Sequence, residues 1–255
     1  MQPRFHLDAG PAQITITHRN QTELFTEIGA RFADGRGFAL ATVNLDHLVK
    51  LRESEAFRRA YGAHDLVVAD GNPIVWMSRL ARRPVGLVPG SDLLIPLVRL
   101  AAQAGVPVAL VGATDQVLEK ASAFLENEIP GVQIVARHAP AQGFEANGAE
   151  AGKILDALAG TPARLILLAL GAPRQEMFAA RGSATLPGVG FASFGAGLDF
   201  LAGHQHRAPR WVRRLAMEWL WRMLGNPRRL AMRYLKCALL LPGLSLRALA
   251  LRGKS

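Results

Sequence analysis

The stretch ARLILLALGAPRQEM (residues 163–177) decides the fold of this chain. Its first half is a continuous apolar run of strand length, and a Gly-Ala-Pro turn then leads into a helix start near Arg174. A strand that is apolar without alternation is typical of a parallel sheet covered on both faces. The stretch therefore predicts one strand–turn–helix unit of an α/β protein.

The same unit recurs along most of the chain. Apolar runs of strand length occur at residues 38–43, 65–69, 107–111, 132–136, 164–170 and 190–194. Stretches with helical periodicity lie between them at residues 46–61, 91–103, 115–126 and 149–158. This alternation predicts a Rossmann-like α/β fold, with a mostly parallel sheet and helices on both faces. Residues 14–17 are expected to add an edge strand.

The charge of the chain is concentrated at its C-terminal end. Residues 204–255 hold twelve Lys or Arg and one acid, a balance of +11, whereas the preceding residues hold eighteen basic and nineteen acidic groups, a balance of −1. We interpret residues 1–203 as a catalytic α/β domain and residues 204–255 as a basic helical membrane-associating appendage. The single cysteine, Cys237, excludes an intramolecular disulfide and a cysteine-rich zinc site and fits a cytoplasmic protein.

The basic end predicts two amphipathic helices, at residues 209–224 and 227–240, followed by a short apolar end. Arg229, Arg233 and Lys236 share one helical face, and Leu230, Tyr234 and Cys237 repeat the same spacing one position further on. Such a helix is suited to an anionic membrane surface. No apolar run is long enough to span a bilayer. Nucleic acid is the rival partner for these arginines; no nucleic-acid-binding signature supports it, and we expect none to bind.

Polar and glycine residues follow the apolar runs, at the carboxyl end of each expected strand. In an open parallel sheet this edge is where ligands bind, so the loops are expected to converge on one crevice. The alternative is that they are ordinary turns, which need Gly, Asp and Asn for conformational reasons. These loops contain Thr42 and Asn44, Asp70-Gly71, residues 112–114, residues 171–176, and residues 195–199.

Asp70 is the candidate general base, because it follows the run LVVA at the rim of a partly desolvated site. The alternative is an Asp that caps the helix starting near Asn72. Arg174 and Gln175 lie at a helix start, where backbone N–H groups favour anions and an arginine can add a phosphate contact. Asp199 can accept hydrogen bonds from a nucleotide base or sugar, or can cap a helix.

Several familiar catalytic signatures are missing. The chain has no G-x-x-x-x-G-K-[ST] loop, no complete G-x-G-x-x-G, no G-x-S-x-G and no Asp-x-Asp pair. The one close histidine pair, His204 and His206, has no carboxylate or cysteine neighbours, which disfavours a metal site. We therefore expect metal-independent chemistry without a cofactor.

Six motifs of the chain resemble the WecG/TagA/CpsF glycosyltransferases in order and spacing, over roughly residues 10–235. The last two motifs are long and distinctive. The motifs are T-x-N (42–44), ADGNPIVW (69–76), GSDLL (90–94), LGAPRQE (170–176), FGAGLDFLAG (194–203) and RAPRWVRRLAMEWLWRMLGNPRRLAMRY (207–234).

This resemblance implies an inverting hexosyltransferase that moves a hexose or N-acetylhexosamine-type sugar from a UDP-sugar to an undecaprenyl-diphosphate-linked acceptor. Such enzymes work at the cytoplasmic face of the bacterial membrane, in exopolysaccharide, teichoic acid or common antigen synthesis. The resemblance makes Asp70 the base and Thr42, Asn44 and Gln175 active-site residues. It places four arginines against the lipid diphosphate or the membrane: Arg207, Arg222, Arg229 and Arg233. Further substrate-binding positions lie in these motifs: Gly71, Asp92, Gly171, Arg174 and Asp199.

The chain departs from the family pattern at three positions. Leu87 stands where the family usually has an arginine, Pro89 replaces a Thr or Tyr, and Val43 replaces a proline. With Leu87 in that place, either another cation contacts the donor phosphates, with Arg82, Arg83 or a tail residue as candidates, or the protein is less active. The change at Leu87 also keeps open a non-catalytic nucleotide-binding assembly factor of a polysaccharide cluster. The incomplete glycine motif disfavours a dehydrogenase, and a homo-oligomer stays open.

Overall fold

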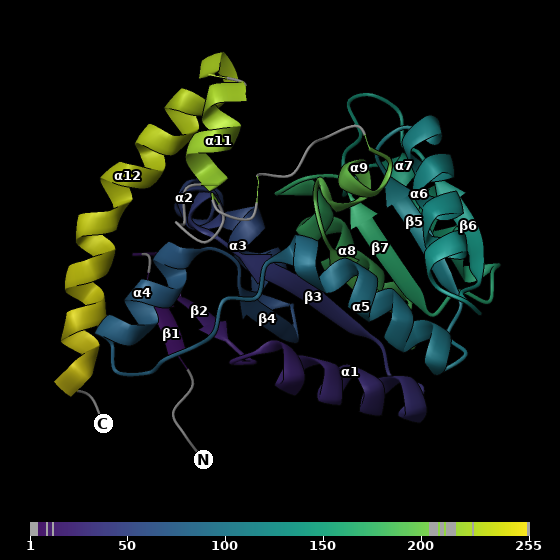
Figure 1. Cartoon of the computed structure of the whole chain (residues 1–255), viewed down its shortest axis with the longest axis horizontal. Helices are drawn as coiled ribbons and strands as arrows, with labels where there is room; N and C mark the ends of the chain where they lie inside the picture. Colours follow the sequence, from purple (N-terminus) through teal and green to yellow (C-terminus); the bar gives the residue numbers. More distant parts are fainter. Residues whose placement is uncertain are drawn as a thin grey trace.

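The computed structural model describes residues 5–8, 10–11, 13–203, 209, 212, 218–225 and 227–253 of the chain (Figure 1). Within these ranges, side chains are not described for Asp8, Glu218, Trp219, Arg222, Gly225, Pro227, Arg229 and Gly253. The described part is an α/β structure with a parallel sheet flanked by helices, as the sequence predicts. A long C-terminal helix lies along one side of it (Figure 1).

The main sheet has six strands in the order β4-β3-β8-β7-β5-β6, and every described pairing in it is parallel. The central strands are buried along their whole length because helices cover both faces, and this accounts for their continuous apolar sequences. The strands are β3 (Phe38–Val43), β4 (Leu66–Ala69), β5 (Val108–Gly112), β6 (Ile134–His138), β7 (Leu165–Ala169) and β8 (Gly190–Ser193).

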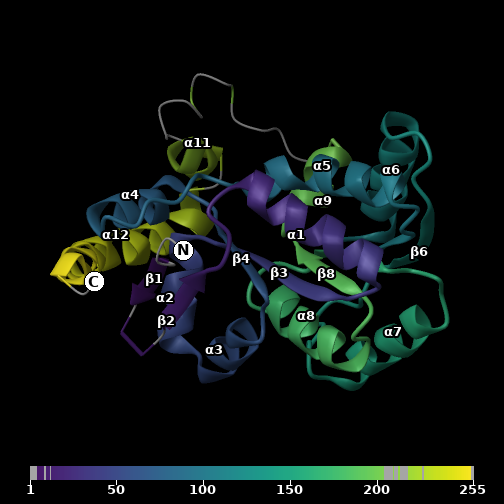
Figure 2. The same cartoon turned by 90° about the horizontal axis from the view of Figure 1, so that it is seen from below.

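Helices form a layer on each face of the sheet (Figure 2). One layer, packed on Leu40, Val68 and Leu167, contains α1 (Gln21–Asp34), α5 (Gly90–Gln103) and α6 (Asp115–Glu128), with the short α9 (Gly197–Leu201) beside them. The opposite layer contains α2 (Leu45–Glu53), α3 (Glu55–Gly62), α7 (Ala149–Ala159) and α8 (Arg174–Thr185). The remaining helix of the body is α4 (Asn72–Leu80).

Two expectations about the body are wrong. The helix expected at residues 46–61 is divided into α2 and α3 at Ser54, whose side chain accepts a hydrogen bond from the backbone N–H of Phe57 and so starts a new helix. The strand expected at residues 14–17 does not join the main sheet. Instead β2 (Gln13–Ile16) pairs antiparallel with β1 (Phe5–Asp8) in a separate two-stranded sheet.

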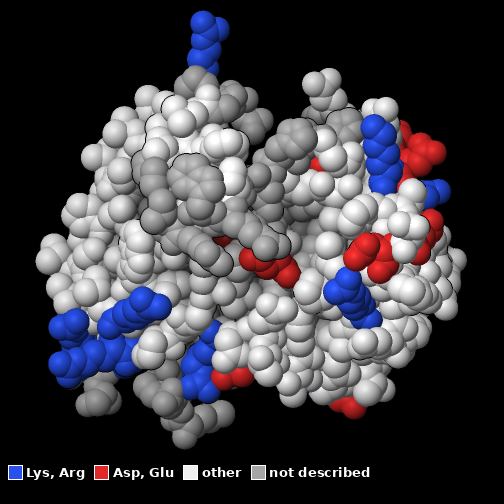
Figure 3. All heavy atoms as spheres, viewed as in Figure 1, with Lys and Arg blue, Asp and Glu red and all other residues white. Residues whose placement is uncertain are grey.

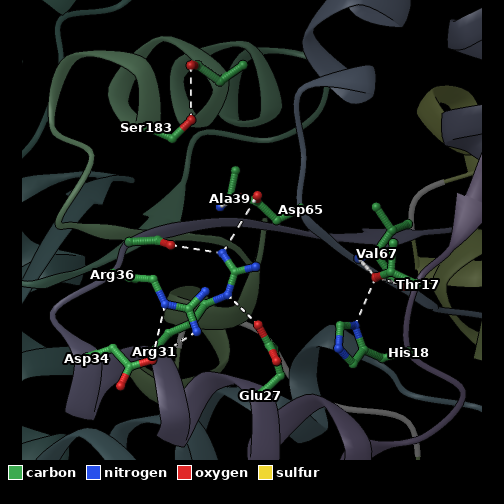
Figure 4. Close-up of polar contacts among 12 residues, drawn as sticks. Thr17, His18, Glu27, Arg31, Asp34, Arg36, Ala39, Asp65, Val67 and Ser183 are labelled. Atoms are coloured by element: carbon green, nitrogen blue, oxygen red, sulfur yellow. Dashed lines mark hydrogen bonds and ion pairs between the residues drawn. The ribbon is translucent and has the colours of Figure 1, made fainter.

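The amino-terminal edge of the main sheet is held by side chains from α1 and the start of β4 (Figure 4). The Asp65 carboxylate accepts a hydrogen bond from the backbone N–H of Ala39 at 3.1 Å and lies 3.6 Å from the Arg31 guanidinium. Arg31 also pairs with Glu27 at 2.7 Å. The hydroxyl of Thr17 accepts a hydrogen bond from the Val67 N–H at 2.7 Å. The Asp65 contacts join the start of β4 to β3 and α1 at the edge opposite the candidate site, and the Thr17 contact joins the residue after β2 to β4.

The C-terminal segment differs from its sequence-based prediction. The described helices are α11 (Glu218–Gly225) and α12 (Pro227–Ala250), followed by a 3₁₀ turn, η1 (Leu251–Gly253). The expected short apolar end after residue 240 is wrong, because α12 continues through Pro242 to Ala250. Leu240, Leu244 and Ala248 on this extension are buried against the body in one cluster with Phe5 and Leu7. Packing therefore overrides the helix-breaking tendency of proline.

Helix α12 has two apolar faces rather than one. Leu230 and Cys237, expected on the lipid-facing side of the helix, are buried at 7% and 6% exposure. A second stripe is exposed on the other side of the helix, and it consists of Met232, Leu235, Leu239, Leu246 and Leu249. At about 100° per residue these five positions lie within one sector about 100° wide. We call this set the exposed stripe of α12. None of the helices in the described ranges is long and apolar enough to cross a membrane.

Candidate functional site

Four loops with predicted site residues leave four neighbouring strands. In the order β4, β3, β8, β7 they carry Asp70, Asn44, Gly195 and Gly171. Neighbouring strands are about 4.8 Å apart, so the four loops lie within about 15 Å of one another along the carboxyl edge. The face of the molecule shown in Figure 3 has a hollow between the part that carries α11 and α12 and the part that carries α5 and α9. Acidic side chains lie in this hollow. The sheet therefore gathers these loops at one edge.

The loop at residues 112–114 lies at the same edge, beside the end of β7, where the Ala113 N–H donates to the Ala169 carbonyl at 3.1 Å. It follows β5, which is separated from β4 by three strands, so its distance from Asp70 along the edge is about 19 Å. The Thr114 hydroxyl accepts a hydrogen bond from the Val117 N–H at 3.4 Å and caps α6. Capping of α6 is sufficient to explain why a polar residue follows this strand.

Asp70 lies one residue past the end of the β3–β4 pairing and diagonally across from Thr42. The backbone N–H of Asp70 donates to the Val43 carbonyl at 2.8 Å, which continues the ladder by one residue. The buried Thr42 hydroxyl donates to the Asp70 carboxylate at 3.5 Å. The N-cap of α4 is Gly71, with φ 116°, so the alternative in which Asp70 is the N-cap does not hold. The carboxylate is half-buried at the rim of the site.

Helix α5 begins beside Thr42 because residue 90 is a glycine. A Cβ at Gly90 would lie 3.2 Å from the Thr42 hydroxyl oxygen and 3.7 Å from the Phe194 ring. The closeness directs the N-terminus of a 14-residue helix at the Thr42–Asp70 pair. Asp92 is exposed in the first turn of this helix, and Leu87 is an exposed apolar residue at 43%.

Gln175 connects the loops after β7 and β8. Its side-chain carbonyl accepts a hydrogen bond from the Gly195 N–H at 2.9 Å, and its amide nitrogen donates to Glu176 at 2.8 Å. Only 4% of Gln175 is exposed. Two of its hydrogen-bonding groups thus hold the loops after β7 and β8 together.

Glu176 anchors this connection from inside the protein. It is fully buried, and burial raises the pKa of its carboxyl to about 7. One oxygen accepts from Gln175 and lies 3.9 Å from the ring of His47, while the other has no hydrogen-bond partner. The His47 ring is 3.2 Å from the Tyr61 hydroxyl, and burial lowers the pKa of His47 to about 3. A neutral imidazole therefore faces a carboxyl that holds its proton up to near neutral pH.

Three other predicted residues have well-defined positions. The Asn44 side chain accepts a hydrogen bond from the His47 N–H at 3.1 Å, so it caps α2 at the edge of the site. Asp199 lies in the first turn of α9, whose N-cap is Ala196, so Asp199 is not the N-cap. Arg174 is exposed at the first position of α8, and no ion pair joins it to another side chain of the described ranges. A cation at a helix N-terminus is unfavourable for the helix itself.

One of the four tail arginines contacts the body of the protein. Arg233, on α12, donates to the Asp46 carboxylate of α2 at 2.9 Å. The second Asp46 oxygen lies 2.7 Å from the Lys50 ammonium, which also donates to the backbone carbonyl of Ala172 at 3.0 Å. Arg207 and the side chains of Arg222 and Arg229 lie outside the described residues.

The part of the chain that is described contains no group of three or more His, Cys, Asp or Glu arranged to hold a metal ion. The pair formed by His204 and His206 lies outside it.

The model of the family described as "Glycosyl transferase WecG/TagA/CpsF family" matches residues 11–254, which is nearly the whole chain. The chain belongs to the WecG/TagA/CpsF family of glycosyl transferases. It is therefore a glycosyltransferase of a family involved in cell-surface polysaccharide synthesis. Sugar nucleotides and lipid-linked acceptors are the substrates of WecG/TagA/CpsF enzymes in general.

In this WecG/TagA/CpsF protein, the residues that hold the site loops from behind cannot be identified as such from the sequence pattern. Asp46 and Lys50 are four residues apart on a helix, a spacing that predicts their pairing but not the contact with Ala172. Glu176 follows Gln175 directly, yet no sequence pattern shows that it is buried. Its contact with His47, whose ring also contacts Tyr61, depends on the packing of α2, α3 and α8.

Proposed function

We propose that this glycosyltransferase moves a hexose or N-acetylhexosamine-type sugar from a UDP-sugar to an undecaprenyl-diphosphate-linked acceptor, with inversion and without a metal ion. Residues 1–203 would be the catalytic domain and residues 204–255 the membrane-associating appendage. The observation that carries the proposal is the Thr42–Asp70 pair at the carboxyl edge of the sheet, beside the N-terminus of α5.

The proposed reaction is a single displacement. Asp70 accepts the proton of the acceptor hydroxyl while that oxygen attacks the anomeric carbon of the donor. A carbon–oxygen bond forms on one face of the sugar, and the bond to the diphosphate breaks on the other, so the configuration inverts. UDP leaves with the bonding electron pair, and the proton stays on Asp70. Thr42 holds the carboxylate in position through its hydroxyl.

The donor diphosphate would lie between the N-termini of α5 and α8. Helices of 14 and 12 residues present backbone N–H groups there, and such groups stabilise a leaving diphosphate. For the cation that Leu87 does not supply we propose Arg174, which is exposed at the first position of α8, rather than Arg82 or Arg83, which follow the C-terminal end of α4. Gln175 and Asp199 are the candidates for contacts with the sugar and the nucleotide.

The C-terminal helix supports attachment to an anionic membrane surface. The exposed stripe of α12 is apolar, and Lys236 and Arg247 lie between this stripe and the buried face of the helix. Figure 3 shows further Lys and Arg side chains gathered where the ends of α4 and α12 lie in Figure 1. The exposed basic residues of these ends are Arg79, Arg82, Arg247 and Arg252. An apolar stripe beside basic groups is the arrangement of an interfacial helix.

The test measures UDP release from a panel of UDP-hexoses and UDP-N-acetylhexosamines, with a synthetic prenyl-diphosphate-sugar acceptor. We expect one donor to be turned over, with no loss when a chelator is added. Asp70→Asn should lower transfer by at least about a thousandfold and leave UDP binding unchanged. Transfer by D70N at the wild-type rate would refute the base assignment. UDP binding without turnover of any donor would favour the non-catalytic assembly factor.

A further inference from the structure

Three charged groups connect the C-terminal helix to the loop after β7. Arg233 of α12 donates to one oxygen of Asp46, and Lys50 lies 2.7 Å from the other oxygen. Lys50 also donates to the carbonyl of Ala172 at 3.0 Å. The Asp46 carboxylate is therefore shared between a cation from the tail and a cation that holds the loop.

The loop held by Lys50 leads directly to Gln175. Ala172 precedes Pro173, the N-cap of α8, and Gln175 lies in the first turn of that helix. Gln175 in turn receives the N–H of Gly195 from the loop after β8. A displacement of the Ala172 carbonyl would consequently reach both loops that border the site.

Because Asp46 is buried, loss of its contact with Arg233 should affect the position of Lys50. Asp46 is 8% exposed, so its carboxylate has little water to replace a lost partner. Lys50 already contacts the carboxylate at 2.7 Å, so when Arg233 is removed the carboxylate is free to shift and pulls the Lys50 ammonium with it. For Lys50 this pull competes with its hydrogen bond to Ala172.

We infer that Arg233 is a positioning residue of the glycosyltransferase site, acting through Asp46 and Lys50 on the loop at residues 171–175. The Arg233–Asp46 contact of α12 thereby sets the arrangement of Gln175. The effect on donor binding rests on the proposed function. The effect on the loop does not.

The chain offers a matched control. Lys236, one turn further along α12, pairs with Glu53 of α2 at 2.8 Å, and this pair is exposed. Glu53→Gln therefore removes another ion pair between the same two helices, one that has no contact with Ala172. Cys237, the single cysteine, reports on docking because it is buried in α12 and its pKa is raised by burial to about 11. Its reaction with a maleimide is slow while the helix is docked.

The experiment compares wild type with Arg233→Ala, Asp46→Asn, Lys50→Met and Glu53→Gln by hydrogen–deuterium exchange. We expect faster exchange over residues 171–178 in R233A, D46N and K50M, with wild-type exchange there in E53Q. Maleimide labelling of Cys237 should stay slow in all four. Unchanged loop exchange in R233A and K50M would overturn the inference.

Kinetics then separate positioning from a direct substrate contact. With a water-soluble acceptor analogue, R233A should raise KM for the donor by about tenfold with a smaller change in kcat. In the D46N background, Arg233→Ala should have no additional effect. A full additional loss in that background would show that Arg233 contacts substrate directly and would overturn the inference. If wild type turns over no donor, the proposed function fails, and loop exchange still decides the coupling.

Discussion

The Thr42 hydroxyl and the Asp70 carboxylate face each other at 3.5 Å across neighbouring parallel strands. Thr42 is the next-to-last residue of β3, and Asp70 directly follows the last residue of β4. The β3–β4 register pairs Thr42 with Val68, two residues before Asp70, so the Thr42 and Asp70 side chains are diagonal neighbours on one face of the sheet. The sheet itself thus places the proposed base and its hydrogen-bond donor.

Thr42→Val tests this pair, because it removes the hydroxyl and keeps the branched shape. We expect kcat to fall by about tenfold, which corresponds to about 1.4 kcal/mol of transition-state stabilisation. The matched variant is Thr42→Ser, which retains the hydroxyl and should stay within about twofold of wild type. Steady-state transfer assays on both variants give the answer. Equal rates for T42V and T42S would show that the hydroxyl does not support Asp70.

Gly90→Ala tests the approach of α5 to Thr42. The new methyl would lie 3.2 Å from the Thr42 oxygen, so Thr42 or the start of the helix must shift. We expect transfer to fall by about tenfold, because a small misplacement of catalytic groups is costly. Gly29→Ala in α1 is the control, since only Leu100 lies within 4 Å of its new methyl. G29A should raise the free energy of unfolding by up to about 1 kcal/mol and leave transfer unchanged. Wild-type activity in G90A would contradict the argument.

Glu176→Gln tests the buried carboxyl through the pH dependence of stability. The pKa of Glu176 is raised from 4.5 to about 7 in the folded protein. The folded state therefore holds the proton more tightly than the unfolded state. The protonated Glu176 carboxyl therefore stabilises the folded state. This contribution to the free energy of unfolding is fully present below pH 4.5 and is lost as the pH rises through about 7. Relative to E176Q, wild type should lose about 2 kcal/mol of unfolding free energy between about pH 5 and about pH 8.

Urea denaturation of both proteins at the two pH values measures this difference. The lowered pKa values of His47 and His64, about 3 and about 4, make stability rise with pH up to about 6.5. Both histidines are neutral in the folded state over the compared pH range and titrate alike in the two unfolded chains, so their contribution is cancelled in the comparison. A wild-type minus E176Q difference that is independent of pH would show that Glu176 is ionised in the folded protein throughout this range.

The double variant Leu235→Glu, Leu239→Glu tests the exposed stripe of α12. Both leucines are more than half exposed, so the charges should not disturb folding. We expect wild type to float with vesicles that contain anionic lipid and the variant to remain in the soluble fraction. Phe124→Glu on α6 is the control, because it charges an exposed apolar residue outside α12. Flotation of the double variant at the wild-type level would show that the exposed stripe of α12 does not contact the membrane.

The sequence predicted the sheet and the edge where the candidate site lies. Continuous apolar runs identified all six strands of the main sheet, and β3 agrees with its predicted limits at both ends. The runs are readable because a strand buried on both faces must be apolar throughout. The same pattern placed Asp70, Asn44, Gly171 and Gly195 at strand ends. The two-stranded sheet and the break at Ser54 were missed, because they depend on packing against α4 and α12 and on a local cap.

The sequence by itself determined where the strands lie along the chain and which residue types follow them at the sheet edge. Burial restricts the strands to apolar residues, and turn conformation restricts the residues that follow them. Only the tertiary structure decided which strands are neighbours, which face of α12 is buried, and that Arg233 reaches Asp46. Residues 46 and 233 are far apart in sequence, and their contact arises from the docking of a helix whose apolar pattern fits two different faces. Local preference cannot choose between those faces. Contact with the body of the protein selects the buried face, because it buries Leu240, Leu244 and Ala248.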